Sequence, residues 1–271
     1  MSDAVNGERS PLAVAADAVE HTGYMLTLTF TAFARFIFNH RPGRMLGRLV
    51  DQLYVHAVKS LLVVTVVAAF TGMVLAIQTG AELKGYGIEE QLPKIVAASL
   101  AREMGPFITS IILAATAGAA IAAELGTMKV SEEIDALELM NVDPVAFLVA
   151  PRVVSMGLAC LVLTVWVNGV GIVGAALVAH TQNGTLYGDF LRGARDTLGS
   201  DMLFGVLSKA LYSGLVKSWC FGVLIGGLSC AAGLRARGGA LGVGKAVRTA
   251  VTASVVVTLI VGYLITWFFW A

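Results

Sequence analysis

Long stretches without any charged residue alternate with short polar segments along most of the chain. Four of these stretches reach or exceed the roughly 20 apolar residues that a helix needs to cross the hydrocarbon of a bilayer. A fifth, residues 218–234, becomes long enough if its helix begins near residue 203 and includes Lys209 and Lys217. The pattern therefore predicts an all-α integral membrane protein. Its five transmembrane helices are expected at about residues 60–81, 104–123, 153–179, 203–234 and 249–271.

An amphipathic segment precedes these five stretches. Residues 22–40 alternate threonine with leucine and phenylalanine, contain Arg35, and lead into a basic run that ends near residue 48. A short apolar stretch with cationic flanks favours a helix that lies in the membrane interface, although a sixth span is an alternative. Residues 1–18 hold three acids and lack the apolar core of a signal peptide. We expect them to form a mobile tail, followed by one membrane domain over residues 19–271.

Composition and charge exclude several classes of protein. Only 14% of the residues are charged and 57% are hydrophobic, whereas soluble domains carry roughly 25% charged residues. The net charge of +1 favours no partnership with nucleic acid. Lys and Arg are more frequent on one side of the five predicted spans, and the richer side is expected to be cytoplasmic. This rule places the N-terminus and the segments near residues 124–152 and 235–248 inside, and the C-terminus outside.

No sequence motif indicates an enzyme. The glycines of the GxGxxG string at residues 169–174 lie in the middle of a span, where close helix packing is the better explanation. Residues 239–245 read GALGVGK, but Ala246 stands where a P-loop needs Ser or Thr to hold magnesium. The four histidines are scattered without metal-ligand spacing. We therefore predict no catalytic residue, no metal and no cofactor.

A short acidic helix is predicted over residues 131–142, between the second and third spans. Ser131 can cap its N-terminus, where Glu132 and Glu133 suit the helix dipole, and Pro144 follows its end. An apolar ridge runs along one side. This combination favours docking into a groove of a soluble partner; packing on the membrane domain itself is the alternative. The candidate partner-binding residues are Ser131, Glu132, Ile134, Asp135, Leu137, Glu138 and Met140.

Ionisable residues also recur near the outer ends of the predicted spans. They form three neighbouring pairs along the chain: Glu82 and Lys84, Arg102 and Glu103, Lys209 and Lys217. Charges at membrane depth are costly and usually face a cavity, a partner or the headgroup region. A cation beside an apolar cavity would suit a lipid phosphate, whereas snorkelling to the interface is the plainer explanation for a single lysine.

Several of these segments together resemble the MlaE-type permeases of ABC transporters that work with MCE proteins. The resembling strings are GMVLAIQ at 72–78, LAREMGP at 100–106, AAELGTMKVSEEIDALELMNVDP at 122–144, APR at 150–152, GIVGAAL at 171–177 and GVGKAV at 242–247. They follow the family's order and cover roughly residues 45–271. The block from 122 to 152 is too long for its similarity to be explained by chance.

The resemblance implies an interfacial N-terminal helix, five spans, and a coupling helix at residues 131–142. It further implies a bacterial inner-membrane permease that pairs with a second permease, identical or paralogous, and with cytoplasmic ABC ATPase subunits. Such a complex passes phospholipid or another hydrophobic molecule to or from an MCE-domain protein. Matching positions make these residues candidates for the outward-facing lipid pocket: Leu75, Ile77, Gln78, Arg102, Glu103 and Lys217. One departure is Thr116, where the family commonly has arginine.

Two other classes compete with this interpretation. A standalone secondary transporter or channel would need ionisable residues in the middle of a span, and the uncharged stretches offer none. An intramembrane lipid enzyme would need a cluster of acids or histidines facing the headgroups, which the sequence does not display.

Overall fold

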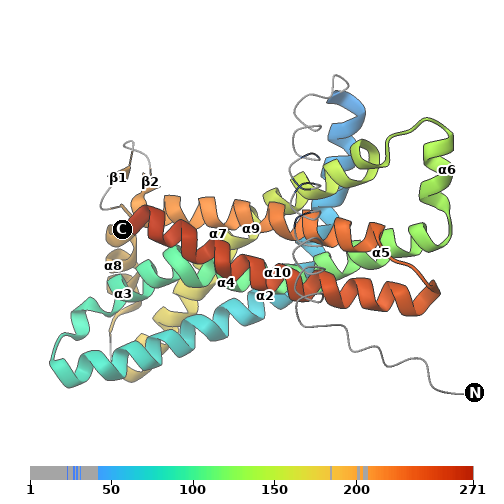
Figure 1. Cartoon of the computed structure of the whole chain (residues 1–271). Coiled ribbons are helices and arrows are strands. Elements are labelled where there is room, and N and C mark those ends of the chain that lie inside the picture. The colour runs from blue at the N-terminus through green and yellow to red at the C-terminus, as the bar shows by residue number, and fades with distance from the viewer. Residues whose placement is uncertain are drawn as a thin grey trace, which may run out of the picture.

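The computed structural model describes Gly23, Thr27, Thr29 and Thr31 and residues 42–183, 185–199, 202–203 and 207–270. Within them, five helical segments are long and apolar enough to cross a membrane, which confirms the predicted number and the all-α class. These segments are Leu49–Tyr86, Glu89–Val130, Val145–Gln182, Lys209–Leu234 and Gly239–Trp270. They run alongside one another through the body of the molecule (Figure 1).

The helical elements have the following bounds. The first is α2 (Pro42–Tyr86), and a short 3₁₀ turn, η1 (Glu89–Gln91), follows it. The second span is continuous but changes its helix type along its length: α3 (Leu92–Ser99), η2 (Leu100–Met104), α4 (Gly105–Leu113), η3 (Ala114–Gly118) and α5 (Ala119–Val130). The remaining elements are α6 (Glu133–Leu139), η4 (Val145–Val149), α7 (Ala150–Asn183), α8 (Tyr187–Gly199), α9 (Lys209–Leu234) and α10 (Gly239–Trp270).

A pair of very short strands is the only sheet in the described part of the chain. β1 (Met202–Leu203) pairs antiparallel with β2 (Leu207–Ser208) directly before α9. The fourth span therefore begins at Lys209 and not near residue 203, as the apolar pattern suggests. Ser208 has extended backbone and its hydroxyl accepts a hydrogen bond from the Leu211 amide at 3.3 Å. This N-cap fixes the start of the helix.

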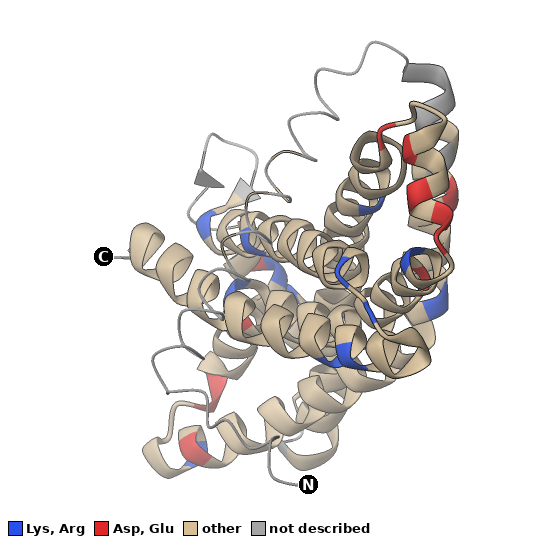
Figure 2. Ribbon diagram, turned by 45° about the vertical axis from the view of Figure 1, so that its right-hand side comes forward, with Lys and Arg blue, Asp and Glu red and all other residues tan. Residues whose placement is uncertain are grey.

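The two ends of the molecule are different (Figure 1). One end carries α6, which forms the connection between α5 and α7. The opposite end carries α3, α8, the strand pair and the end of α10. Phe190 of α8 is fully buried together with Leu92 and Val96 of α3, so α8 is anchored on the second span. Figure 2 shows most charged residues, coloured on the ribbon, near the helix ends, with long uncharged stretches between them.

Close backbone contact holds α2 against α7. A Cβ atom at Gly72 would overlap the carbonyl group of Gly171, and one at Gly174 would crowd the backbone of Ala69. Two glycines of the GxGxxG string thus face α2, which confirms the interpretation that the string serves helix packing. Gly169, the third, faces open space.

The helix predicted over residues 22–40 lies outside the described residues, apart from Gly23, Thr27, Thr29 and Thr31, which are helical. Thr29 is buried, and its side chain lies against Gly227 of α9. The predicted mobile tail of residues 1–18 also falls outside the described residues.

Candidate functional site

Two π-helical turns interrupt the second span, η2 near one end and η3 near the other. A π-helical turn inserts an extra residue into the hydrogen-bond ladder and often occurs at functional sites. Arg102 and Glu103 lie on η2. Thr116 lies on η3.

Lys217 of α9 reaches the η2 turn and is almost completely buried, with 1% of its side chain exposed. Its Nζ forms an ion pair with the carboxylate of Glu103 and donates to the carbonyl oxygen of Arg102 at 3.2 Å. Gly214, one turn earlier, makes this approach possible because a Cβ there would collide with the carbonyl oxygen of Ala101. The structure thus brings together Arg102, Glu103 and Lys217 from segments far apart in sequence.

Glu103 also faces a cavity of about 490 Å³ between the second span, α9 and α10. Thr266 of α10 donates to the Glu103 carboxylate at 3.1 Å. The rest of the wall is mostly apolar: Met104, Phe107, Phe221, Thr258, Leu259, Gly262 and Tyr263. The site therefore combines a charged, hydrogen-bonded edge with an apolar wall, as an amphiphilic ligand requires.

Trp270, at the end of α10, lies beside two cations, Arg102 and Lys209. The Arg102 guanidinium carbon lies 3.6 Å from the centre of a Trp270 ring, and the Lys209 ammonium lies 4.7 Å from it. Both distances suit cation–π interactions. Nothing in the sequence distinguishes Thr266 and Trp270, because a threonine in an apolar helix and a tryptophan at its end are ordinary in membrane spans.

The three α2 candidates do not join this group within one chain. Leu75 packs with the cluster around Phe190, and Ile77 and Gln78 have exposed side chains. None of the three lines the cavity beside Glu103. The lipid-pocket residues carried over by resemblance therefore divide into a contacting group of three and a separate group on α2.

At the opposite end, α6 is shorter than the predicted helix and begins differently. Ser131 ends α5 and does not cap α6, because Glu132 adopts a left-handed backbone (φ 61°) and makes no side-chain cap. Asn141 is also left-handed (φ 58°), so α6 ends at Leu139 before Pro144 is reached. Asparagine tolerates this conformation well, whereas glutamate does so rarely.

The apolar ridge of α6 turns inward. Ile134 is 3% exposed and Leu137 is half-buried, which agrees with the alternative that this side packs on the membrane domain. Leu139 and Met140 instead project outward, and Leu139 is 90% exposed. Glu132, Glu133, Asp135 and Glu138 are exposed as well, and they form the acidic surface of α6 in Figure 2.

Two ion pairs stabilise the connection between α5 and α7, and one of them involves α6. Asp135 pairs with Lys129 of α5 at 2.6 Å. Arg152 of α7, nearly buried, pairs with Glu124 of α5 at 2.9 Å. The Glu124–Arg152 pair links the helices that enter and leave the α6 connection, so a displacement of α6 can reach both. Among the described residues, no cluster of His, Cys, Asp and Glu could hold a metal ion.

These features define a multi-pass helical membrane protein with an amphiphilic cavity near one end and an acidic connecting helix at the other. Residues 49–268 match the family described as Permease MlaE. The chain is 36% identical to a probable ABC transporter permease protein of Rickettsia typhi, over 91% of each chain. It is 34% identical to a similarly described protein of Synechocystis, over 80% of each.

A further relative has a more specific description. The intermembrane phospholipid transport system permease protein MlaE of Haemophilus influenzae is 33% identical over 79% of each chain. The chain belongs to the MlaE permease family. It is accordingly a transporter component and not an enzyme.

Proposed function

We propose that this chain is the permease subunit of an ABC transporter in a bacterial inner membrane, and that it moves phospholipid to or from an MCE-domain protein. A separate cytoplasmic ATPase supplies the energy. The family match and the phospholipid transport description of the Haemophilus relative support this function. In this arrangement the N-terminus and α6 face the cytoplasm.

The observation that carries the proposal is the cavity beside Glu103. A phospholipid needs a charged contact for its headgroup and an apolar surface for its chains. Arg102, the chain neighbour of Glu103, offers a cation next to the cavity, and its buried Nε has no hydrogen-bond partner among the described residues. Phe107, Phe221 and Leu259 line the cavity and offer the apolar surface. Lys217 and Glu103 neutralise each other, so the net charge available to a phosphate comes from Arg102 and Lys209.

A second permease copy would complete this pocket. Of the five spans, α2 and α10 are the least buried within one chain. α10 exposes Leu259, Tyr263 and Trp267, and α2 exposes Ile77 and Gln78. We infer that two copies meet through these helices, which would bring Leu75, Ile77 and Gln78 of α2 toward the lipid.

The outward side chains of α6 supply the proposed contact with the ATPase. Leu139 and Met140 form an exposed apolar pair, and Glu138 stands beside them on the acidic surface. Ser131, Glu132, Ile134, Asp135 and Leu137 then hold α6 in position. Movement of the ATPase would reach the spans through α5 and α7, which the Glu124–Arg152 pair connects.

Co-purification from native membranes tests this function. A tagged chain, extracted in mild detergent, should recover an ABC ATPase, an MCE-domain protein and bound phospholipid, all identifiable by mass spectrometry. Reconstituted into vesicles, the complex should transfer phospholipid only when ATP is hydrolysed. Recovery of the chain alone, with transport that needs no ATP, would instead identify a secondary transporter.

The variant Leu139→Asp tests the role of α6. It removes an exposed apolar contact and adds charge, so we expect the ATPase to be lost from the purified complex while the permease stays folded. Leu186→Asp is the matched control, since Leu186 is also exposed but lies beside α8 at the opposite end. Recovery of the ATPase with Leu139→Asp at the wild-type ratio would refute the docking proposal.

A further inference from the structure

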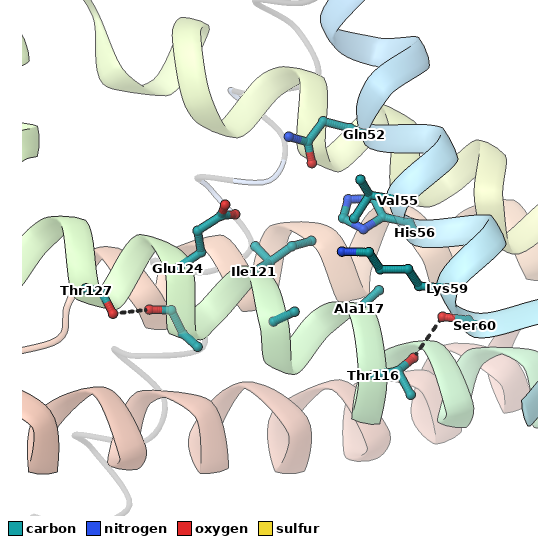
Figure 3. Close-up of a pocket in the computed structure, with 12 residues that line it drawn as sticks. Gln52, Val55, His56, Lys59, Ser60, Thr116, Ala117, Ile121, Glu124 and Thr127 are labelled. Carbon is teal, nitrogen blue, oxygen red and sulfur yellow. Dashed lines mark hydrogen bonds between the residues drawn. The ribbon is translucent and has the colours of Figure 1, made fainter.

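A second polar cavity lies at the α6 end of the molecule, between α2 and α5 (Figure 3). Its volume is about 690 Å³, within the range of small-molecule binding sites. Its polar lining comes from α2, η3 and α5: Gln52, His56, Lys59, Thr116, Glu124 and Thr127. In Figure 3, Gln52, Lys59 and Glu124 extend toward the same space from opposite walls.

The ion pairs leave one positive charge at this cavity. Glu124 is neutralised by Arg152, which holds it at 2.9 Å from the far side. Lys59 is exposed to the cavity and forms no ion pair with the described residues. The balance between Lys59, Glu124 and Arg152 is therefore positive, and an anion entering the cavity would meet an ammonium group that has no other partner.

A buried polar atom on the cavity wall also lacks a partner. His56 is only 4% exposed, and its Nε2 has no hydrogen bond within the described part of the chain. Buried polar groups nearly always find a partner, so an unpaired one points to a bound molecule. The neighbouring hydroxyls of Ser60 and Thr116 are 3.1 Å apart and bind each other. Lys59, Gln52 and the Nε2 atom of His56 then remain available to a ligand, and Lys59 is the cation among them.

The surroundings favour a lipid over a dissolved anion. The cavity lies within the first and second spans, close to the residue where the first span begins, Leu49. Val55, Ala117 and Ile121 complete its wall with apolar surface. A phosphate at this depth with apolar groups attached is what a phospholipid headgroup presents.

We propose that the cavity between α2 and α5 binds the phosphate group of a phospholipid from the leaflet at the α6 end, as a second lipid site separate from the cavity beside Glu103. Lys59 pairs with the phosphate, and the His56 ring donates to one of its oxygens. The assignment of this leaflet as cytoplasmic rests on the proposed function. The site would hold lipid at the opposite end of the second span from the outward-facing pocket.

Photo-crosslinking of the reconstituted complex tests this site. The probe is phosphatidic acid with a diazirine near the glycerol, and mass spectrometry locates the labelled peptides. We expect labelling of residues 52–60 and 116–127. A diacylglycerol probe with the same chains lacks the phosphate and should label these peptides about tenfold less, as expected when a charge-assisted hydrogen bond is lost. Equal labelling by both probes would overturn the proposal.

Two variants of Lys59 test whether its positive charge binds the phosphate. Lys59→Gln should reduce labelling of the inner peptides about tenfold, whereas Lys59→Arg keeps the charge and should retain the labelling. Lys245→Gln is the matched control, because Lys245 is exposed on α10 and does not line the cavity. Unchanged labelling in Lys59→Gln would refute the role of this lysine and with it the site.

Competition and a parallel readout separate the remaining explanations. If excess inorganic phosphate abolishes the labelling, the cavity is a site for free anions, and the lipid proposal is wrong. Labelling near Glu103 and ATP-driven transfer are recorded in the same samples. If these persist while the inner peptides stay unlabelled, only the second site fails; if they are absent as well, the proposed function itself fails.

Discussion

The lysines beside the two cavities of the second span differ: Lys217 is paired with a carboxylate, whereas Lys59 has no ion pair among the described residues. Beside η2, Lys217 is buried but fully occupied by the Glu103 carboxylate and the Arg102 carbonyl. Beside η3, Lys59 is exposed to its cavity, and the carboxylate that lines the same cavity, Glu124, is already paired with Arg152. A buried ammonium without a partner is very unfavourable, so Lys217 must be neutralised for the helices to pack. Lys59 is under no such constraint and is available to a ligand.

This difference separates structural charges from binding charges. At the η2 end the Lys217–Glu103 pair joins α9 to the second span, and the cations left for a ligand are Arg102 and Lys209, which flank Trp270. At the η3 end the cation itself is left for the ligand, and the neighbouring pair, Glu124–Arg152, joins α5 to α7. In both places one ion pair holds helices together. The remaining cations beside η2 lie over Trp270, whereas the remaining cation beside η3 lines the cavity.

The largest expected effect comes from breaking the Lys217–Glu103 pair. Glu103→Leu leaves the Lys217 ammonium buried with only a carbonyl partner, which should cost about 3 to 5 kcal/mol of folding free energy. Lys217→Met leaves Glu103, which is 42% exposed, and should cost less, about 1.5 to 3 kcal/mol. Chemical unfolding of the purified protein in detergent micelles measures both values.

A substitution at Glu82 is the matched control for this pair of variants. Glu82→Leu makes the same substitution at an exposed position of α2 and should change stability by less than about 0.5 kcal/mol. If Lys217→Met proves more destabilising than Glu103→Leu, the carboxylate and not the ammonium is the charge that depends on its partner. The proposed contrast between Lys217 and Lys59 would then be wrong.

The sequence predicts the five spans well because a span must be apolar over its whole length. It predicts the contents of the site beside Glu103 only in part. Arg102 and Glu103 are neighbours in the chain, but nothing in their spacing relates them to Lys217, which comes to the η2 turn through the close approach at Gly214. The resemblance to MlaE-type permeases supplies that relation. Under the proposed function, the three candidates on α2 join the site only through a second chain, and one sequence contains no signal for such a contact.

The acidic connecting helix shows a different limit. Its helical periodicity and charge are visible in the sequence, and α6 exists within the predicted range. The direction of its apolar ridge is not visible, because burial of Ile134 depends on how α6 lies against the end of α5. The left-handed backbone at Glu132 removes Ser131 from the cap position, and no residue preference predicts that conformation for glutamate. The exposure of Leu139 also depends on how α6 packs, so the sequence does not predict it.

A smaller effect should follow from changing Trp270, whose ring lies beside Arg102 and Lys209. Trp270→Leu removes both cation–π contacts and should cost about 1 kcal/mol, while Trp270→Phe should recover part of it. Trp267→Leu is the control, since Trp267 is a more exposed tryptophan of the same helix and none of the described cations lies over its ring. Thermal unfolding in detergent, compared across the three variants, measures the contribution. Equal losses at both tryptophans would show that Trp270 acts through membrane anchoring alone.

The smallest effect is expected at Thr116, on the wall of the inner cavity. Thr116→Val removes the 3.1 Å hydrogen bond between Thr116 and Ser60 and the 2.7 Å bond that Thr116 donates to the Ile112 carbonyl oxygen, and it preserves the side-chain shape. Hydrogen bonds between membrane helices contribute about 0.6 kcal/mol on average, and the Ser60 hydroxyl can bond to a backbone carbonyl of its own helix instead. Unfolding in micelles should therefore change very little, because polar groups around the inner cavity do not hold the fold together. If Thr116→Val is as destabilising as Glu103→Leu, the inner wall is a structural network of the same kind as the Lys217 pair, and the availability of Lys59 to a ligand loses its physical basis.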